Sequence, residues 1–195
     1  MSVNTRQRIR TDIRHLRRAI TASQQTDYAF QLVKQCQSLP ELTRAKHVAL
    51  YLATDGELDT QPLIDDLWRQ GINTYLPVIH PFSKGQLLFL RYHADTPLVA
   101  NQYRILEPQL DQRMICPVRQ LDIIFTPLVA FDKQGQRLGM GGGYYDRTLA
   151  PWRFSGQGPN AIGLAHNFQQ VSALPSESWD VPLATIITPE QTWRW

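Results

Sequence analysis

The sequence predicts an α/β protein, a three-layer sandwich in which helices flank a mainly parallel central sheet. A short and nearly continuous apolar run at 47–52 has the length and composition of a strand that is covered on both faces. A helical pattern at 59–71 and a second strand at 73–78 follow it, and this strand–helix–strand order is typical of parallel pairing. Further buried strands are expected at 121–126, 161–165 and 184–188.

Length and composition limit the organisation of the chain. With 195 residues, 43% of them hydrophobic, it can bury the core of a single domain spanning 1–195. No apolar run reaches membrane-spanning length and no signal-peptide segment precedes the first helix, so we expect a cytoplasmic monomer with no membrane partner. Cys36 and Cys116 lack metal-type spacing, and both are predicted to be reduced thiols without a nucleophilic role.

The first 40 residues predict two helices, and the first helix is strongly basic. Apolar residues recur at helical spacing over 4–20, at Ile9, Ile13, Leu16 and Ile20. A second stripe lies directly beside the apolar one and consists of Arg6, Arg10, Arg14 and Arg17. Thr21 and Gln24 form a capping-box pattern for the second helix, which must end before Pro40.

Three interpretations of the arginine stripe remain open at this stage. Arginines at the edge of a packed face can reach into a groove and bind phosphate oxygens in a bidentate manner. The stripe is equally compatible with a solvated basic face. Nucleic-acid binding is the weakest alternative, because the patch is short and has no interleaved aromatic residues.

Four glycines within five residues, Gly139, Gly141, Gly142 and Gly143, form the most informative stretch of the chain. Such a run lets the backbone approach a ligand closely and direct several N–H groups at one anion, so it predicts a phosphate site, with a structural glycine turn as the alternative. The run differs from the dinucleotide fingerprint, because Tyr144 stands at the place of its third glycine. It also lacks the Lys-Ser/Thr of a P-loop. A helix from Tyr144 to about Trp152 would add free N–H groups.

Three carboxylates are candidates for binding a ligand or a metal. Glu57 follows the first predicted strand, where ligands of parallel sheets gather, although an exposed loop carboxylate is the simpler interpretation. Asp146 and Asp180 could hold Mg²⁺, which takes oxygen ligands. With the glycine run and the arginines, these residues predict an ATP- or phosphate-dependent enzyme and leave its acceptor open.

The segment Arg137 to Arg147, preceded by 122–132, resembles the signature of the 5-formyltetrahydrofolate cyclo-ligase family, also called methenyltetrahydrofolate synthetase. Further matching segments extend the resemblance over about residues 6 to 190: Leu52 to Thr60, Leu76 to Val78, Ile105 to Pro108, and Leu174 to Asp180. The resemblance implies a ligase in which ATP phosphorylates the formyl oxygen of 5-formyltetrahydrofolate. N10 then attacks the iminophosphate, giving 5,10-methenyltetrahydrofolate, ADP and phosphate. A different ATP-dependent phosphoryl-transfer enzyme is the alternative.

The resemblance also implies roles for individual residues. ATP is expected at the N-terminal helix and the glycine run, that is, at Arg6, Arg10, Arg137, Leu138, Gly139, Met140, Gly141, Gly142, Gly143, Tyr144 and Tyr145. The folate is expected at Leu52, Glu57, Met140, Gly141, Gly142, Gly143 and Tyr144. Asp146 and Asp180 match Mg²⁺ positions, while Arg137 and Tyr144 are the expected catalytic residues.

Three positions depart from the pattern of the family. Arg6 stands where many members have lysine, and Trp179 stands where histidine is more usual. Gly142 stands where some members have a loop lysine, which leaves Arg10 or Arg147 to neutralise the transferred phosphate. Expected partners are 5-formyltetrahydrofolate and ATP, and no nucleic acid.

Overall fold

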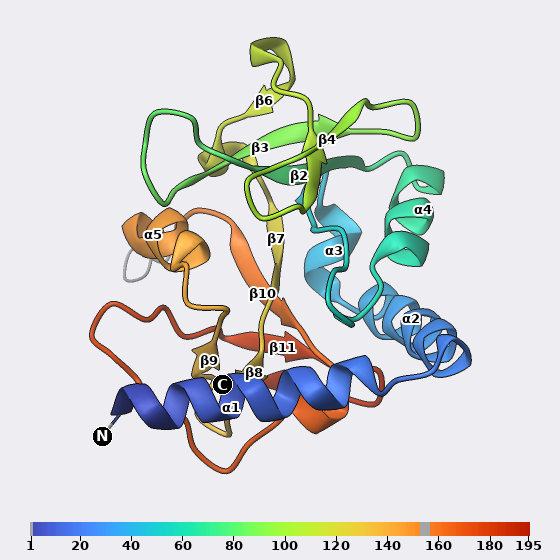
Figure 1. Ribbon diagram of the computed structural model, residues 1–195. Coiled ribbons are helices and arrows are strands. Elements are labelled where there is room, and N and C mark those ends of the chain that lie inside the picture. The colour runs from blue at the N-terminus through green and yellow to red at the C-terminus, as the bar shows by residue number, and fades with distance from the viewer. Residues whose placement is uncertain (1, 153–156) are drawn as a thin grey trace.

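The computed structural model describes residues 2–152 and 157–195, and its centre is an eight-stranded sheet (Figure 1). The strands lie in the order β12-β11-β10-β7-β1-β2-β3-β6. Their bounds are β1 His47–Ala49, β2 Asn73–Ile79, β3 Leu87–Tyr92, β6 Ile115–Cys116, β7 Ile123–Pro127, β10 Asn160–Leu164, β11 Thr185–Ile187 and β12 Thr192–Arg194. Two hairpins stand outside this sheet: β4 (Leu98–Ala100) with β5 (Leu106–Pro108), and β8 (Ala130–Phe131) with β9 (Arg137–Leu138).

The prediction of a mainly parallel central sheet is confirmed. Strand β1 pairs in parallel with β2 and β7, and β10 pairs in parallel with β7 and β11. The outer strands β12, β3 and β6 are antiparallel. Strand β12 and the two hairpins were not anticipated, because short strands of two or three residues carry too little periodicity to be recognised.

The helices are α1 (Ser2–Arg18), α2 (Ala22–Gln37), α3 (Pro40–Arg44), α4 (Gln61–Arg69) and α5 (Tyr144–Leu149). Single 3₁₀ turns occupy Gln112–Met114, Val118–Gln120, Ala150–Trp152 and Asn167–Gln169. The predicted capping box is present: Thr21 accepts from the backbone N–H of Gln24, whose side chain accepts from Thr21 in return. None of the described helices is long and apolar enough to cross a membrane.

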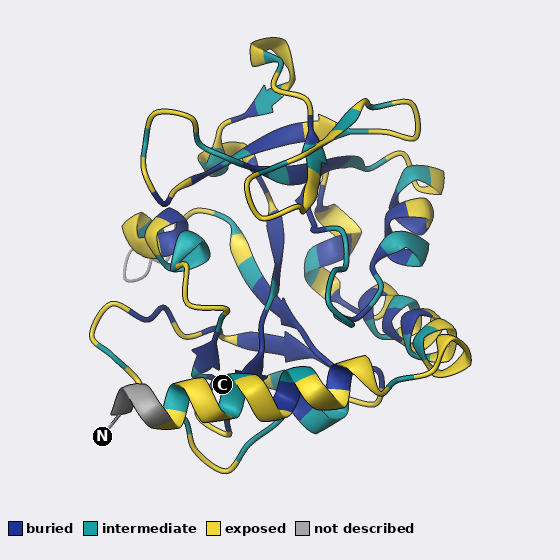
Figure 2. Cartoon of the chain, in the orientation of Figure 1, coloured by how far each residue is buried: buried dark blue, intermediate teal, exposed yellow. Residues whose placement is uncertain are grey.

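Helices cover both faces of the sheet, as the predicted sandwich requires. On β7, Ile123 and Phe125 point into the cluster formed with α2, α3 and α4, whereas Ile124 points into the cluster that contains Leu149 of α5. Figure 2 shows the buried residues concentrated in the strands and on the inner sides of α2 and α4. Because α4 follows β1 and α5 follows β7, the chain winds in opposite directions from these two neighbouring strands, which makes a topological switch point between them.

Helix α1 packs differently from the prediction at one position. Its apolar face covers the β8–β9 hairpin, where Ile13 joins the buried cluster of Val129 and Leu138. Leu16 was expected on this face but is 47% exposed, while Arg17 is only 1% exposed. Arg17 follows Ile13 by four residues and therefore takes the inward position, where backbone carbonyls satisfy its guanidinium.

The core should depend on the middle of β7. Phe125 is fully buried, and its replacement by alanine should lower the free energy of unfolding by about 3–5 kcal/mol through lost burial and an unfilled cavity. Phe82→Ala is the matched control, because Phe82 is 92% exposed and its loss should change stability very little. Urea unfolding of both variants measures the difference, and equal effects would contradict the packing described for β7.

Candidate active site

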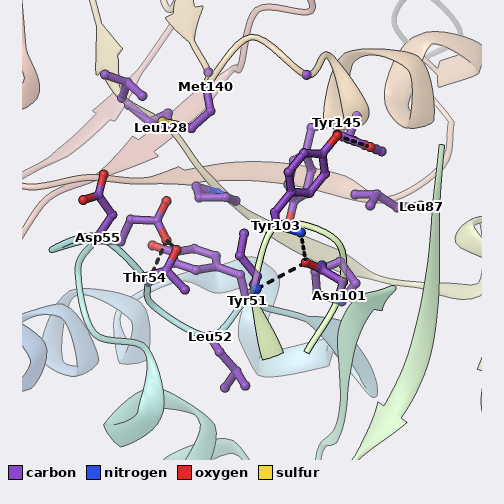
Figure 3. A pocket seen from close by; sticks show the side chains of 18 of the residues that line it. Tyr51, Leu52, Thr54, Asp55, Leu87, Asn101, Tyr103, Leu128, Met140 and Tyr145 are labelled. Carbon is purple, nitrogen blue, oxygen red and sulfur yellow. Dashed lines mark hydrogen bonds between the residues drawn. The ribbon is translucent and has the colours of Figure 1, made fainter. Parts of the chain in front are cut away.

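A cavity of about 610 Å³ opens above the carboxyl ends of the parallel strands. Its floor comes from Tyr51 and Leu52 after β1, Ile79 at the end of β2, and Leu128 and Val129 after β7. The β4–β5 hairpin and the glycine run form its walls, and Figure 3 shows Met140 and Asn101 entering it from these different segments. The cavity thus lies at the switch point, where open α/β sheets place their ligands.

The glycine run joins β9 to α5 and borders the cavity. Gly141 and Gly143 have φ angles of 101° and 63°, which other residues adopt only with strain. Gly139, Met140, Gly142, Gly143, Tyr144 and Tyr145 line the cavity. Leu138 does not line the cavity, because its side chain is buried in the core beside Ile13. Only its backbone could contact a ligand.

Two arginines hold the glycine run from opposite sides. Arg10 of α1 donates from Nε to the carbonyl of Gly139 at 2.9 Å. Arg147 donates from Nε to Gly85 at 2.9 Å, and its guanidinium also donates to the carbonyl of Gly142. Burial, with a contribution from nearby Arg6, lowers the pKa of Arg10. Both cations proposed to replace the loop lysine therefore lie against the run.

Arg137 and Asp146 form an ion pair at 2.7 Å beside the cavity. The Arg137 side chain is 3% exposed and also donates to the carbonyl of Val181 at 3.1 Å. Burial lowers the pKa of Arg137, while Asp146 raises it in opposition. Asp146 Oδ1 accepts a second hydrogen bond, from Val181 N at 3.0 Å, which places Asp146 next to the segment that carries Asp180.

The two predicted metal ligands are thus near each other in the fold, but both contact arginine. Arg6 donates to both oxygens of Asp180, at 2.9 and 3.2 Å. Both hydrogen bonds that Asp146 accepts from Arg137 and Val181 use Oδ1, which leaves Oδ2 for a ligand. Among residues 2–152 and 157–195, no cluster of three or more His, Cys, Asp or Glu is arranged to hold a metal. Mg²⁺ bound with a nucleotide needs only one or two protein carboxylates, so this pair fits it once Arg6 releases Asp180.

The loop that carries Glu57 is held by side chains from three other segments. Arg17 of α1 donates to the carbonyls of Thr54 and Asp55, the latter at 2.8 Å. His166, after β10, contacts the carbonyl of Gly56 through Nε2 at 3.1 Å, and Gln25 of α2 donates to the carbonyl of Glu57. Four consecutive carbonyls are therefore satisfied from outside the loop, which fixes its conformation.

Gly56 is required by this loop. It has φ 71°, and a Cβ at this position would lie 2.6 Å from the carbonyl oxygen of Arg17. The preceding Asp55, at φ 51°, receives charged hydrogen bonds from Arg14 at 2.6 Å and Arg18 at 2.5 Å. Burial raises the pKa of Asp55, but the hydrogen bonds from Arg18 and Arg14 lower it further, so the pKa of this carboxyl lies below its usual value.

The carboxylate of Glu57 is directed into a buried polar corner of the cavity. Oε2 accepts from Thr54 N at 3.0 Å, and Oε1 lies 3.8 Å from Arg17. Burial raises the pKa of Glu57, with Arg17 acting in the opposite direction. Two nearby buried atoms, Tyr145 OH and Arg17 NH1, have no hydrogen-bond partner within the described residues. The corner therefore offers unsatisfied polar groups to a ligand.

The structure brings most of the predicted site residues to this cavity and adds others that were missed. Leu52 and Glu57 line the same cavity as the glycine run, and the Tyr144 hydroxyl lies 3.0 Å from that of Tyr103 on the β4–β5 hairpin. Arg17 had been noted only as part of a basic stripe. Gln25, His166 and the hairpin carried no recognisable signal, because their roles depend on contacts across 32 to 110 residues.

The arginine stripe faces the protein rather than solvent. Arg6 contacts Asp180, Arg10 contacts the glycine run, and Arg14 contacts Asp55. This orientation agrees with the anion-site interpretation and leaves few of these charges for nucleic acid.

The fold and the site define an α/β enzyme with a glycine-rich loop beside the cavity at the switch point of its sheet. Residues 2–189 match the model of the 5-formyltetrahydrofolate cyclo-ligase family. The chain is 51% identical to the 5-formyltetrahydrofolate cyclo-ligase of Escherichia coli K12 over 94% of its length and 100% of the relative, and 51% identical to that of Haemophilus influenzae over 96% and 99%. This chain belongs to the 5-formyltetrahydrofolate cyclo-ligase family and is a ligase of folate metabolism.

Solved structures agree with this assignment. The Aquifex aeolicus 5,10-methenyltetrahydrofolate synthetase superposes with a TM-score of 0.81 at 28% identity, covering 97% of this chain and 92% of the other. A 5,10-methenyltetrahydrofolate synthetase from Mycoplasma pneumoniae gives 0.72 at 26% identity, covering 94% and 98%. The family resemblance seen in the glycine run therefore extends through the whole fold.

The histidine behind the Glu57 loop should make stability depend on pH. Burial lowers the pKa of His166 from 6.5 to about 4, so between these values the unfolded chain binds a proton that the folded chain excludes. Stability should therefore fall as the pH drops, by about 2 kcal/mol between pH 7 and pH 5 from this residue. In His166→Gln, which keeps an N–H donor for Gly56 and does not titrate, urea unfolding should show a shallower pH dependence. Equal pH dependence in both proteins would contradict the buried neutral imidazole.

Proposed function

We propose that this chain catalyses the ATP-dependent cyclisation of 5-formyltetrahydrofolate to 5,10-methenyltetrahydrofolate, with release of ADP and phosphate. The observation that supports this most directly is that one cavity has a buried carboxylate corner at Glu57 and an arginine-supported glycine loop at the opposite wall. The first suits the N–H groups of a pterin, and the second suits phosphate. The relatives are named 5-formyltetrahydrofolate cyclo-ligases, which agrees with this substrate and with a ring closure.

We propose that the pterin binds at the Glu57 corner. An ionised carboxylate is an acceptor only, and the pterin presents an amino group and ring N–H groups as donors. The unsatisfied Tyr145 hydroxyl lies beside Glu57 and adds a group that can donate to the pterin or accept from it. Leu52 supplies apolar contact, and the ring of Tyr144 packs on the folate from the glycine-run side.

ATP is proposed to lie on the glycine run. Arg6 and Arg10 of α1 reach this region, and the backbone of 139–143 supplies N–H donors to the polyphosphate. Asp146 and Asp180 would hold Mg²⁺, which neutralises phosphate charge. Arg6 is then free to contact phosphate once it releases Asp180.

The chemistry requires alignment and charge stabilisation rather than a protein nucleophile. The formyl oxygen attacks the γ-phosphorus and the bond to ADP breaks. N10 then attacks the formyl carbon and gives up its proton to the departing phosphate as the C–O bond breaks. Because the phosphoryl group passes through a loose transition state, the contribution of the protein is to bring the two substrates together. Arg137 lines the cavity, which supports a role in stabilising the charge of the transferred group, while its hydrogen bond to Asp146 positions that carboxylate.

A phosphoryl-transfer enzyme acting on another acceptor remains the second candidate function. It would use the same glycine run but would have no need of the Glu57 corner. Hydrogen bonds from three other segments fix the loop that carries Glu57, which is expected if this carboxylate has to bind a substrate. They therefore favour the folate reaction. We also propose that the chain acts in the cytoplasm as a monomer of one domain, with residues 1–40 completing the ATP site.

The direct test is the absorbance of the methenyl product. Purified protein mixed with Mg-ATP and 5-formyltetrahydrofolate should form 5,10-methenyltetrahydrofolate, with one ADP released per product. Omitting either substrate should abolish the signal. ATP hydrolysis that is indifferent to the folate, with no methenyl product, would instead support the second candidate.

Variants at the two ends of the cavity should separate the two substrates. Glu57→Gln should raise KM for the folate by about 10- to 100-fold, the range of a charge-assisted hydrogen bond, with KM for ATP little changed.

Asp146→Asn should lower kcat and increase the Mg²⁺ concentration required, and it should also lower thermal stability because buried Arg137 loses its charged partner. Glu190→Gln, an exposed carboxylate away from the cavity, is the control for charge. Identical kinetic defects in the first two variants would contradict the separate roles.

A further inference from the structure

One arginine of the cavity wall lacks the partner that the others have. The arginines that line the cavity are Arg14, Arg17, Arg104 and Arg137. Arg14 and Arg17 pair with Asp55, and Arg137 pairs with Asp146. Within residues 2–152 and 157–195, no ion pair is found for Arg104, which is exposed at the turn of the β4–β5 hairpin. It is a cation at the open side of the site with no anion of its own.

The backbone holds Arg104 in a conformation that disfavours any side chain. Its φ is 61°, in the left-handed region, which costs a residue with a Cβ about 1 kcal/mol or more relative to glycine. Arg104 N donates to the carbonyl of Asn101 at 2.9 Å, and Asn101 Oδ1 accepts from the N–H of Tyr103 and Ile105 at 2.9 and 3.2 Å. The turn is therefore built around an arginine where glycine would be less strained.

The turn is also fixed to the sheet. Asn101 Nδ2 donates to Glu107 Oε2 at 2.9 Å, and the same oxygen accepts from Ile79 N at 3.2 Å, at the end of β2. The backbone of Arg104 consequently has a defined place relative to the end of β2. A side chain carried on such a fixed turn requires less ordering of the backbone on binding than one on a mobile loop.

The substrate of the proposed reaction carries the complementary charge. Beyond its pterin, 5-formyltetrahydrofolate has an aminobenzoyl group and a glutamate with two carboxylates. The other arginines that line the cavity, Arg14, Arg17 and Arg137, are already paired with Asp55, Glu57 or Asp146, so they offer no free cation to a carboxylate. With the pterin at Glu57, the exposed Arg104 is the cavity-lining arginine left for the glutamate. We propose that Arg104 binds the glutamate carboxylates of the folate, and this subsite rests on the proposed function above.

Such a contact determines specificity rather than chemistry. An ion pair that remains partly solvated changes affinity by up to about fivefold. Salt should weaken it, because exposed charges are screened. Because Arg104 would contact the glutamate tail and not the transferred phosphate, its loss should change KM for the folate and leave kcat unchanged.

The test compares 5-formyltetrahydrofolate with its α,γ-diamide, which keeps the size of the tail and removes both charges. Arg104→Gln should raise KM for the charged substrate by about fivefold at low salt and leave KM for the diamide unchanged. Arg104→Lys should recover part of the loss. Arg8→Gln, which removes a side chain that is 83% exposed on α1, is the matched control and should change neither KM.

A second variant tests the strained turn independently of any fold defect. Arg104→Gly should unfold at the same or a higher temperature than the parent, because glycine tolerates φ 61°, and should still lose the preference for the charged tail. Equal KM changes for both substrates, or no change for either in Arg104→Gln and Arg104→Gly, would overturn the subsite. Failure of the parent protein to form the methenyl product would instead overturn the proposed function, so the two failures are distinguishable.

Discussion

The buried guanidinium of Arg17 is the interaction on which the rest of the site depends. It is 1% exposed, yet it lies in the wall of the ligand cavity, where it satisfies the carbonyls of Thr54 and Asp55 and faces Glu57 at 3.8 Å. A charge this deeply buried is tolerated only because backbone dipoles and two carboxylates surround it. In return it joins α1 to the loop after β1. The shape of the corner around Glu57 and the position of the first helix therefore depend on the same side chain.

Helix α1 consequently crosses the side of the molecule where the parallel strands end, and it contacts the segments that follow them. Successive turns place Arg6 on Asp180, Arg10 on the glycine run and Arg14 on Asp55, so a single helix contacts the proposed metal, nucleotide and folate regions. Apolar contacts pack α1 against the β8–β9 hairpin, and the ion pairs and hydrogen bonds of its arginines fix which face of the helix turns toward the cavity. The arrangement also explains why the two proposed metal ligands contact arginines: Asp146 and Asp180 need a cation nearby when no nucleotide is bound.

Long-range contacts limited what could be predicted from the chain alone. The periodicity of α1 correctly indicated a helix, but helical spacing places Leu16 and Arg17 almost equally close to the packed face, and only the loop at 54–57 decides that Arg17 turns inward. Glu57 was identified from its place after a strand, whereas the residues that fix it, Gln25 and His166, lie 32 and 110 positions away from their hydrogen-bond partners. The hairpin bearing Arg104 sits in a proline-containing stretch of short strands, where alternation is too brief to be detected.

The sequence by itself determined the α/β class, the parallel core strands, the glycine run and its family, because these follow from local composition and spacing that do not depend on distant neighbours. Only the tertiary structure decided which charges meet. It joined Arg137 to Asp146 and Arg6 to Asp180, and it left Arg104 without an ion pair among the described residues. The physical reason is that an ion pair depends on the distance between two side chains and on their burial. Both are properties of the packed sheet and helices rather than of any segment of the chain.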